Sequence, residues 1–506
     1  MKKRLIVTFL LVMAAAALWV SPTGAGEYML FDKPLTLLGY VTQGVAYGLN
    51  DEYDTKHGIQ SALMNLFLEG QYRINPQFNL YASGRFSADW AYPLNNGQRD
   101  WNNRLFDQSS NRMYLDNNYW QILNEAHATW TPGNFFFRVG KQIVSWGEMD
   151  GFRIMDQINP LDSRRGFADV EFENTLIPIW LIRSEFYPRV STSWLQDLGL
   201  EFVFNPNADF IPNQDILIGN ADAGIWAPNL RFADPTAPFG FVRLGRAAGY
   251  NIGKPDNWNS DGYEYALRLK GVVHDAIVTL NYFYGLDNSP VLKTAAIDPV
   301  INIASDGVVL VSPFLEGRFF PLKFVGLTAS RDIPFLKATS LGGVAPVLRL
   351  ESFYGFGSTF LTPNNDFGNS DEVRAGLGID WKIKIPLINE KAGITISPQV
   401  YYRRLTNLPD EEKWTDSGNT LLEKDNWQST LFISTPYMNA KLVPSFFWLR
   451  DFTGEANFYR LQVTYDWSSA WRGTLGAFFI NGQQQNNSFE AFGNKNYLYF
   501  KVTYKF

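Results

Sequence analysis

The sequence contains no cysteine and only three histidines in 506 residues. The lack of cysteine excludes a disulfide scaffold, a thiolate metal site and a cysteine nucleophile, and three histidines disfavour a histidine-rich metal centre. After the N-terminal segment there is no apolar run close to the about 18–20 residues of a membrane-spanning helix, which excludes a polytopic helical membrane protein. The formal net charge of −6 disfavours a nucleic-acid-binding surface.

Aromatic residues are abundant, with 40 Phe, 24 Tyr and 16 Trp. Together with a hydrophobic share of 46%, they exclude a disordered chain. A soluble protein of this length would be expected to split into domains of about 150 residues. The patterns below instead predict one domain over residues 26–506.

The N-terminus has the layout of a secretory signal peptide. Three basic residues at positions 2–4 precede an apolar stretch over 5–20, and small residues follow as far as Gly26. We therefore predict that residues 1–25 are removed on export. A single membrane anchor is the alternative, although the apolar stretch is shorter than most spanning helices.

Apolar and polar side chains alternate through most of the remaining chain. The pattern is uninterrupted over residues 77–90 and recurs over 263–270, 372–382 and 457–467. Alternation indicates strands with one apolar and one polar face. These strands exceed the usual soluble length of about 5–6 residues and match the about 9–11 needed to cross an outer membrane. A β-sheet in lipid can pair every backbone amide and carbonyl only if it closes into a barrel. We therefore predict an all-β transmembrane antiparallel barrel.

We count eighteen candidate strands along the chain. Sixteen remain an alternative, because the pattern is weakest over 176–188 and 197–206. Short turns alternate with longer loops, of which 146–175 and 207–260 stand out, and an even strand number places both barrel ends in the periplasm. The predicted strands are 36–49, 59–73, 77–90, 119–131, 134–145, 176–188, 197–206, 261–271, 275–286, 316–330, 343–356, 372–385, 393–406, 427–436, 440–450, 456–467, 471–481 and 495–506.

The last predicted strand ends in Tyr504 and the terminal Phe506, with apolar residues at every second position before them. It resembles the C-terminal signature of Gram-negative outer-membrane barrels. That resemblance implies an outer-membrane location, surrounding lipid, and recognition of Tyr504 and Phe506 by the barrel-assembly machinery.

A second resemblance lies in the segment from Arg138 to Glu148 (RVGKQIVSWGE), followed by Gln157 to Gly166 (QINPLDSRRG). It resembles an uncharacterised family of proteobacterial outer-membrane barrel proteins, classed as a domain of unknown function. It is more distantly similar to porins and alginate-export channels. The resemblance implies a channel, and we expect the protein to be a monomer or a trimer. It also implies a partner, an inner-membrane exporter that moves hydrophobic or lipid-like molecules.

The loop over 146–175 is rich in charge, and a loop folded into a barrel of this size would set the width and charge of the pore. We hypothesise that charged residues of this loop and of the strand before it form the constriction. The alternative is that these charges pair with the wall and only hold the loop in place. The residues are Arg138, Glu148, Asp150, Arg153, Asp162, Arg164 and Arg165.

The polar strand faces predict a lumen of mixed sign, which disfavours a channel for an anionic polymer. Aromatic residues such as Tyr81, Tyr401, Tyr497 and Tyr499 share those faces and either stack on solutes or only fill space. The predicted lumen-lining charges are Arg85, Glu125, Arg268, Arg349, Arg374 and Arg460.

The sequence thus predicts an outer-membrane channel of unknown substrate that uses no cofactor, metal or nucleic acid. The first alternative is a transporter of hydrophobic compounds that works with an inner-membrane exporter, with a lateral gate where Pro346 and Pro398 interrupt strands. A more remote alternative is an outer-membrane hydrolase. His127 and Glu125 share a face there, but no nucleophile motif accompanies them.

Overall fold

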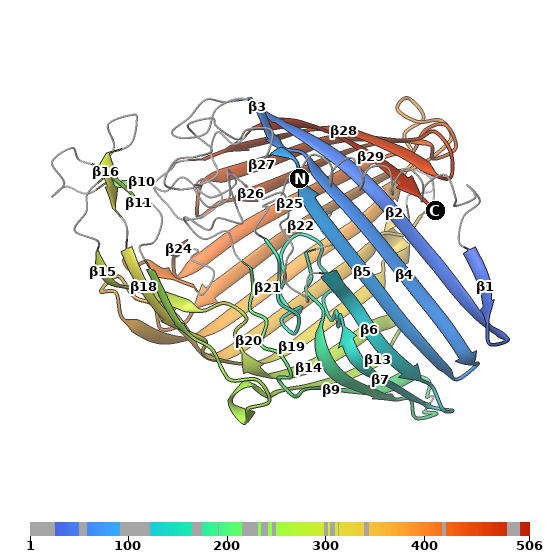
Figure 1. Cartoon of the computed structure of the whole chain (residues 1–506), viewed down its shortest axis with the longest axis horizontal. Helices are drawn as coiled ribbons and strands as arrows, with labels where there is room; N and C mark the ends of the chain where they lie inside the picture. Colours follow the sequence, from blue (N-terminus) through green and yellow to red (C-terminus); the bar gives the residue numbers. More distant parts are fainter. Residues whose placement is uncertain are drawn as a thin grey trace, which may run out of the picture.

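The structure is a computed structural model, and it shows one large antiparallel β-barrel (Figure 1). Among the described residues, no helix is long and apolar enough to cross a membrane. The structure describes residues 26–49, 58–91, 122–163, 175–190, 192–214, 231–233, 241–244, 249–297, 302–303, 309–311, 313–337, 344–416, 421–482 and 496–506.

The barrel wall is a closed ring in which every strand pairs antiparallel with its neighbours. Strand β29 closes the ring on β2 over nine residue pairs, from Tyr40 with Lys505 to Gly48 with Tyr497. The wall strands are β2 (Lys33–Gly48), β4 (Leu63–Asn75), β5 (Phe78–Asp89), β6 (Leu123–Trp130), β7 (Phe135–Gln142), β8 (Ile179–Phe186), β9 (Leu195–Asn205), β13 (Glu264–Val273), β14 (Ala276–Leu286), β19 (Pro321–Asp332), β20 (Val347–Leu361), β21 (Phe367–Ile383), β22 (Ile394–Leu405), β25 (Asp425–Ser434), β26 (Leu442–Asp451), β27 (Ala456–Asp466), β28 (Trp471–Asn481) and β29 (Tyr497–Lys505).

The prediction of an eighteen-stranded barrel is confirmed, and each predicted strand overlaps one wall strand. The sixteen-strand alternative is wrong, because β8 and β9 pair with each other and with the wall on either side. The first strand begins earlier than predicted, at Lys33, because β1 (Gly26–Leu30) forms a hairpin with it. The segment predicted from residue 316 is split between β18 (Pro313–Arg318) and the wall strand β19.

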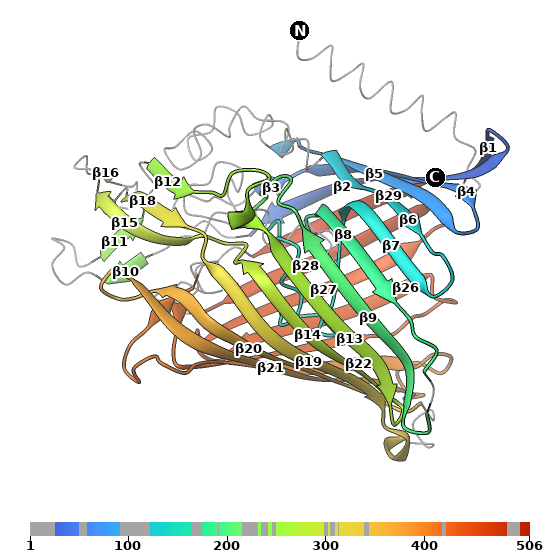
Figure 2. The ribbon, with the colours of Figure 1, turned by 90° about the horizontal axis from the view of Figure 1, so that it is seen from below.

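The two long connections around 207–260 and 287–315 contain small sheets at one end of the barrel (Figures 1 and 2). Alternation along one segment could not reveal these sheets, because two of the pairings are parallel and join distant parts of the chain: β11 with β17, and β12 with β18. The strands are β10 (Arg231–Ala233), β11 (Phe241–Leu244), β12 (Gly249–Gly253), β15 (Val291–Ile297), β16 (Asn302–Ile303), β17 (Val309–Val311) and β18.

The outer surface of the wall is apolar, as a barrel in lipid requires. On β13 and β14, Tyr265, Leu267, Leu280 and Tyr282 are exposed, while the residues between them face inward and are buried or half-buried. Exposed tryptophans cluster at the end where the turns are short, as an interfacial girdle would. They include Trp130, Trp194, Trp467 and Trp471.

The two prolines assigned to a lateral gate behave differently. Pro346 lies before β20 rather than inside a strand, and its carbonyl accepts a hydrogen bond from the Ile333 amide at 2.8 Å. Pro398 lies within β22 and pairs with Leu431 on the β25 side. On the β21 side the ladder runs from Gly378–Gln399 directly to Trp381–Ile396, because proline has no amide to donate.

Candidate channel constriction

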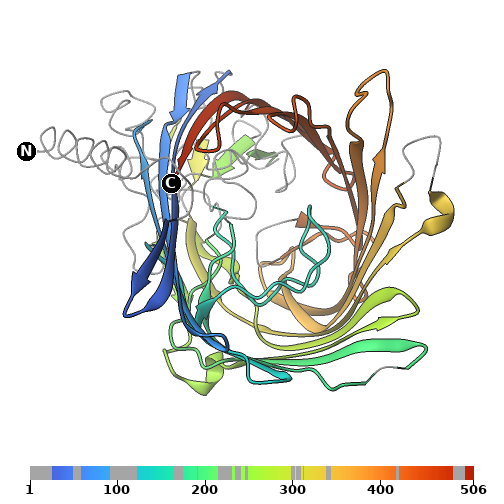
Figure 3. The ribbon, with the colours of Figure 1, turned by 90° about the vertical axis from the view of Figure 1, so that its right-hand side faces the viewer.

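After β7 the chain leaves the wall and runs inside the barrel before it rejoins the wall at β8 (Figure 3). We call the described parts of this connection, residues 143–163 and 175–178, the lumen loop. Gly140 lies near the end of β7, two residues before the strand ends at Gln142, and has a φ of 134°. A Cβ there would lie 2.2 Å from the Ala126 carbonyl oxygen, so the glycine of the RVGKQ segment is required by the backbone.

The two ends of the lumen loop are clasped by Asn159, which is fully buried. Its side-chain oxygen accepts from the Val144 amide at 2.7 Å. Its side-chain nitrogen donates to the carbonyls of Gln142 at 3.1 Å and Ile177 at 2.9 Å. One amide side chain therefore joins the end of β7 to the start of β8.

A carboxylate inside the loop shapes its first turn. The Asp156 Oδ1 accepts from the Ser145 hydroxyl at 3.0 Å and from the amides of Trp146 at 2.5 Å and Gly147 at 2.9 Å. A Cβ on Gly147 would lie 2.5 Å from the other carboxylate oxygen, so this turn accepts only glycine without rearrangement.

A carboxylate of the wall holds the same turn from outside. Glu351 on β20 is fully buried and accepts from three loop amides, those of Glu148, Met149 at 2.8 Å and Met155 at 3.2 Å. Such charge-assisted bonds are among the stronger hydrogen bonds in proteins. Because they bring together residues on either side of the loop tip, Glu351 fixes the shape of the loop as well as its position.

Polar side chains of β20 and β22 hold the next part of the loop. Arg349 donates to the Glu148 carbonyl and to the Asp150 carboxylate, the latter at 2.7 Å. Gln399 donates to the same carboxylate at 2.9 Å, and the Tyr401 hydroxyl accepts from the Gly151 amide at 3.0 Å. The side chain of Asp150 remains 71% exposed, so it contacts both the wall and the open lumen.

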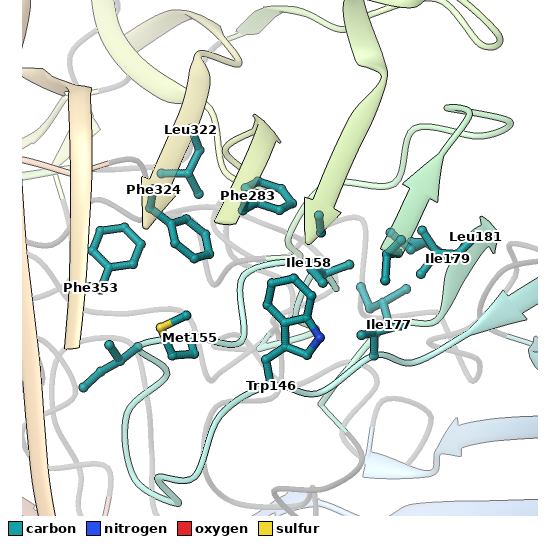
Figure 4. Packing of buried hydrophobic residues seen from close by; sticks show 14 of the residues in the cluster. Trp146, Met155, Ile158, Ile177, Ile179, Leu181, Phe283, Leu322, Phe324 and Phe353 are labelled. Atoms are coloured by element: carbon teal, nitrogen blue, oxygen red, sulfur yellow. The ribbon is translucent and has the colours of Figure 1, made fainter. Parts of the chain in front are cut away.

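Apolar side chains of the loop pack against the lumen face of the wall (Figure 4). Two wall glycines receive them: a Cβ on Gly326 would lie 2.5 Å from the Met155 sulfur, and a Cβ on Gly376 would lie 2.7 Å from Ile154 Cδ1. We call this arc of the barrel, from β8 to β22, the loop wall. Its cluster contains Val144, Trp146, Met149, Ile154, Met155, Ile158, Ile177, Ile179, Leu181, Val203, Ile211, Ala266, Phe283, Leu322, Phe324, Phe353 and Tyr401.

A second apolar cluster lies on the facing wall, the arc of β26–β29 with β2 and β4. Phe152 of the loop packs against both clusters and meets the Tyr401 ring edge-on at a centroid distance of 4.9 Å. The lumen loop therefore connects the two walls through one aromatic side chain. The facing cluster contains Ala46, Ala62, Leu63, Ala91, Leu449, Phe458, Phe478, Ile480, Tyr497 and Tyr499, with Trp90 and Phe447 beside it.

Residues 48–506 match the model of a family described as a protein of unknown function, DUF1302. The chain belongs to the DUF1302 family. That match covers all but the start of the described barrel and includes the lumen loop. No curated protein matches the chain.

Solved structures similar to this DUF1302 chain include bacterial porins. A loop-deletion mutant of OmpT from Vibrio cholerae shares 9% identity over 94% of this chain and 99% of that chain, with a TM-score of 0.38. OmpF from Salmonella typhi, in complex with daunomycin, shares 8% over 95% and 100%, also with a TM-score of 0.38. A triple mutant of Rhodopseudomonas blastica porin shares 11% over 93% and 100%, with a TM-score of 0.34.

The charges predicted for the constriction occupy different positions in the DUF1302 lumen. Asp150 lies on the loop, beside the open lumen, and pairs with Arg349. Arg153 is turned inward and donates to the Asn159 carbonyl at 2.9 Å; burial lowers the pKa of its guanidinium to about 10, although Asp156 opposes the shift. Burial raises the pKa of Glu148, with Arg268 and Arg349 opposing. Arg164 and Arg165 lie outside the described residues.

The remaining two predicted constriction residues lie away from the loop tip. Arg138, on β7, donates to the Thr129 hydroxyl at 3.0 Å and lies over the Phe136 ring. The Asp162 amide donates to the Thr175 carbonyl at 2.7 Å, where the loop returns to the wall. The structure thus brings Glu148 and Asp150 together with the wall arginine Arg349, but not with these two.

The predicted lumen-lining charges lie on the inner faces of their strands, and most contact aromatic rings. Four of them lie over rings on neighbouring strands or on the loop, and Arg374 also pairs with Glu372 at 2.7 Å. Arg349 and Glu125 instead bind the loop directly, the latter through the Ile143 amide at 3.2 Å. The ring contacts are Arg85 with Phe67, Arg268 with Trp146, Arg374 with Phe353, and Arg460 with Phe447.

The residues considered for a hydrolase have other partners. His127 stacks on Tyr81 at a centroid distance of 5.1 Å, and its Nδ1 lies 3.4 Å from the Thr129 hydroxyl, while Glu125 binds the loop. Within the described ranges, no group of three or more acidic or histidine side chains is arranged to hold a metal ion.

Sequence reasoning missed most of the residues that hold the loop, including Asn159, Asp156, Glu351 and Gln399. Glu351 and Gln399 look like ordinary lumen charges and amides when one strand is considered alone. The sequence did contain one sign of the docked loop. Gly326 and Gly376 occupy inward-facing positions of their strands, where most other residues have a larger side chain. Such gaps in a lumen face are expected where another segment packs closely.

Proposed function

We propose that this protein is an outer-membrane channel whose constriction is apolar and selects bulky apolar or amphipathic solutes over small ions. The observation that carries the proposal is Phe152, which packs against the apolar clusters of both walls. A closed barrel with an apolar outer belt is the architecture of outer-membrane proteins, and its short-turn end faces the periplasm.

The chemistry of the lumen favours this solute class. The lumen of a general porin is polar and water-filled. Here, by contrast, two apolar clusters line opposite walls, and aromatic rings stack across adjacent strands, as Phe283 does on Phe324 at 5.4 Å. Apolar constrictions block ions because water does not wet them. The charges nearest the tip are paired, because Arg349 binds the carboxylates of both Asp150 and Asp380.

The same lumen supports the association predicted with an inner-membrane exporter of hydrophobic or lipid-like molecules. An apolar constriction at the outer membrane suits the cargo of such an exporter. A pull-down from membranes after chemical cross-linking, followed by identification of the captured inner-membrane proteins, tests this part of the proposal separately from the channel.

The test of the channel is conductance of the refolded protein in a planar bilayer, combined with uptake of an apolar fluorophore by proteoliposomes. We expect rare, small ion steps but measurable fluorophore uptake. Phe152→Ala should enlarge the ion steps, because the aromatic contact between the walls is lost. Phe202→Ala, on the lipid face of β9, is the matched control and should leave both readings unchanged.

Large stable ion steps in the parent protein that do not change in Phe152→Ala would contradict the proposal. They would show a water-filled pore whose width is set elsewhere, as in a general porin. Heat-shifted gel mobility verifies that each variant is folded before it is measured.

A further inference from the structure

Three neighbouring hairpins expose large apolar residues at the short-turn end of the barrel. They are the turns from β19 to β20, from β21 to β22 and from β25 to β26, which follow one another in the wall. Leu387 is 97% exposed, Phe335 is 85% exposed and Met438 is 61% exposed. Exposure of this degree on three adjacent turns indicates a surface that meets something other than water. We call it the turn platform.

Two of the three turns, the one from β21 to β22 and the one from β25 to β26, are tied together by hydrogen bonds. Asn389 is buried and donates to the Thr435 hydroxyl at 2.9 Å and to the Pro436 carbonyl at 2.8 Å. It also accepts from two amides of its own turn, and the Tyr437 hydroxyl donates to the Ile388 carbonyl at 2.9 Å. The exposed side chains of Leu387 and Met438 are therefore presented by two turns that brace each other.

The platform also carries an excess of positive charge. Besides Lys382 near the end of β21, five exposed cations lie on these turns and their flanks, against two exposed carboxylates, Asp332 and Glu390. Within the part of the chain that the structure describes, none of these cations forms an ion pair. The turn from β27 to β28, residues 467–470, carries no charge at all. The five cations are Arg331, Lys337, Lys384, Lys391 and Lys441.

We propose that the turn platform binds anionic phospholipid of the periplasmic leaflet, with its lysines on the headgroup phosphates and its apolar tips among the acyl chains. The platform continues the lipid-facing surface of the same strands, where Leu350, Leu377 and Val400 are exposed. The gold segment after β19, residues 333–337, extends past the strand ends and away from the barrel (Figures 2 and 3). Basic side chains beside apolar ones are the pattern of an interfacial anchor for anionic lipid.

The absence of cysteine in the chain makes the test direct. The full-length protein with Leu387→Cys is labelled with a bimane fluorophore and reconstituted in phosphatidylcholine vesicles. Headgroup-proximal doxyl-phosphatidylglycerol or doxyl-phosphatidylcholine is added, and the ratio of the two quenching constants is measured. Ser469→Cys, in the uncharged turn between β27 and β28, is the matched control.

We expect phosphatidylglycerol to quench the Leu387→Cys label at least about fivefold more strongly, since one lysine near an anionic surface contributes about that factor. The control ratio should stay near one. Adding Lys384→Gln, Lys391→Gln and Lys441→Gln should bring the platform ratio down to the control value. Equal quenching by the two lipids in the parent would overturn the proposal. So would no quenching by either lipid, which would place the platform in water as a surface for a periplasmic protein.

Discussion

The two walls that face each other across the lumen bury apolar surface in different ways. The loop wall has gaps in its inner face, at Gly326 and Gly376, and a buried carboxylate, Glu351, which together receive a foreign segment of chain. On the facing wall, the gap at a glycine is filled by a side chain of the same wall: a Cβ on Gly476 would lie 2.2 Å from the Tyr499 ring. Its aromatic rings pack on one another, as Phe458 does on Phe478 at 4.2 Å.

This difference shows how one barrel can use one wall to hold the loop and the other wall to form the constriction with it. A wall that receives a loop needs small residues and hydrogen-bond acceptors, because the backbone of the loop brings unpaired amides with it. A wall packed from its own side chains fills its gaps itself, as Tyr499 does beside Gly476. The facing wall meets the loop mainly through Phe152, and that single contact is the place where passage is decided in our proposal.

The largest effect is expected at Glu351 on the loop wall. Glu351→Ala leaves three loop amides without their acceptor, and we expect the packed loop to lose about 3–5 kcal/mol. Ion conductance should rise, and chymotrypsin should cleave the loop. Glu351→Gln keeps an acceptor oxygen, so its ion conductance and its rate of loop cleavage should lie between those of the parent protein and those of the alanine variant. An uncleaved loop with unchanged conductance in Glu351→Ala would show that apolar packing alone holds the loop.

On the facing wall, removal of an aromatic ring should affect the barrel rather than the loop. Phe458→Ala should lower the free energy of unfolding by about 3 kcal/mol, because it leaves a cavity among packed rings. Urea titration of the protein in vesicles measures this. Chymotrypsin should still spare the loop, in contrast to Glu351→Ala. If chymotrypsin cleaved the loop of Phe458→Ala as fast as that of Glu351→Ala, the packing of the facing wall and the docking of the loop would not be independent.

A smaller effect is expected from filling a recess on the loop wall. Gly376→Val places atoms where Ile154 packs and should destabilise the packed loop by about 1–3 kcal/mol. The frequency of open steps in a planar bilayer reports this. At Gly44 on the facing wall, where a Cβ would lie 3.4 Å from its nearest neighbour, Lys501 Cγ, alanine should be tolerated and serves as the control. Equal open frequencies in both variants would argue against a specific recess.

The smallest effect concerns pH and Glu148. Burial raises the pKa of its carboxyl, Asp150 and Asp156 raise it further, and Arg268 and Arg349 oppose the shift. The packed loop therefore holds this proton more tightly than a released loop. Packing should be weakest above the raised pKa and should strengthen as the pH falls toward the ordinary value of about 4.3.

Because Glu148 is only partly buried, we expect this effect to stay below about 1 kcal/mol. The frequency of open steps in a planar bilayer, recorded from above the raised pKa of Glu148 down to its ordinary value, measures this effect. In Glu148→Gln the frequency should change less with pH. A slope that persists in Glu148→Gln would assign the titration to another group.

The strands were predictable from the sequence because alternation is a local property of each strand. Wherever one face meets lipid, as on β13 and β27, the pattern is uninterrupted. The small sheets in the long connections could not be predicted in the same way. Their pairings, such as β12 with β18, depend on parts of the chain that are far apart in the sequence.

The candidate site was predictable only in part. The charge-rich loop after Gly140 indicated where a constriction would form, and Asp150 and Arg349 were both among the residues named for the lumen. The apolar side of the constriction was missed, because Phe152 and Ile154 look like ordinary loop residues until the opposite wall is known. Their partners lie hundreds of positions away, on strands whose relative placement no local pattern reveals.

The seam between β2 and β29 has a consequence for the order of assembly. The hydroxyls of Thr42 and Thr503 lie 2.8 Å apart across it, although 461 positions separate them in the chain. Ring closure of that span is the entropically most demanding contact in the molecule, and topologies dominated by such contacts fold slowly. The lumen loop starts out between strands near the beginning of the chain. It can therefore dock on β20 and β22 while the sheet is still open, so that the constriction is built before the pore exists.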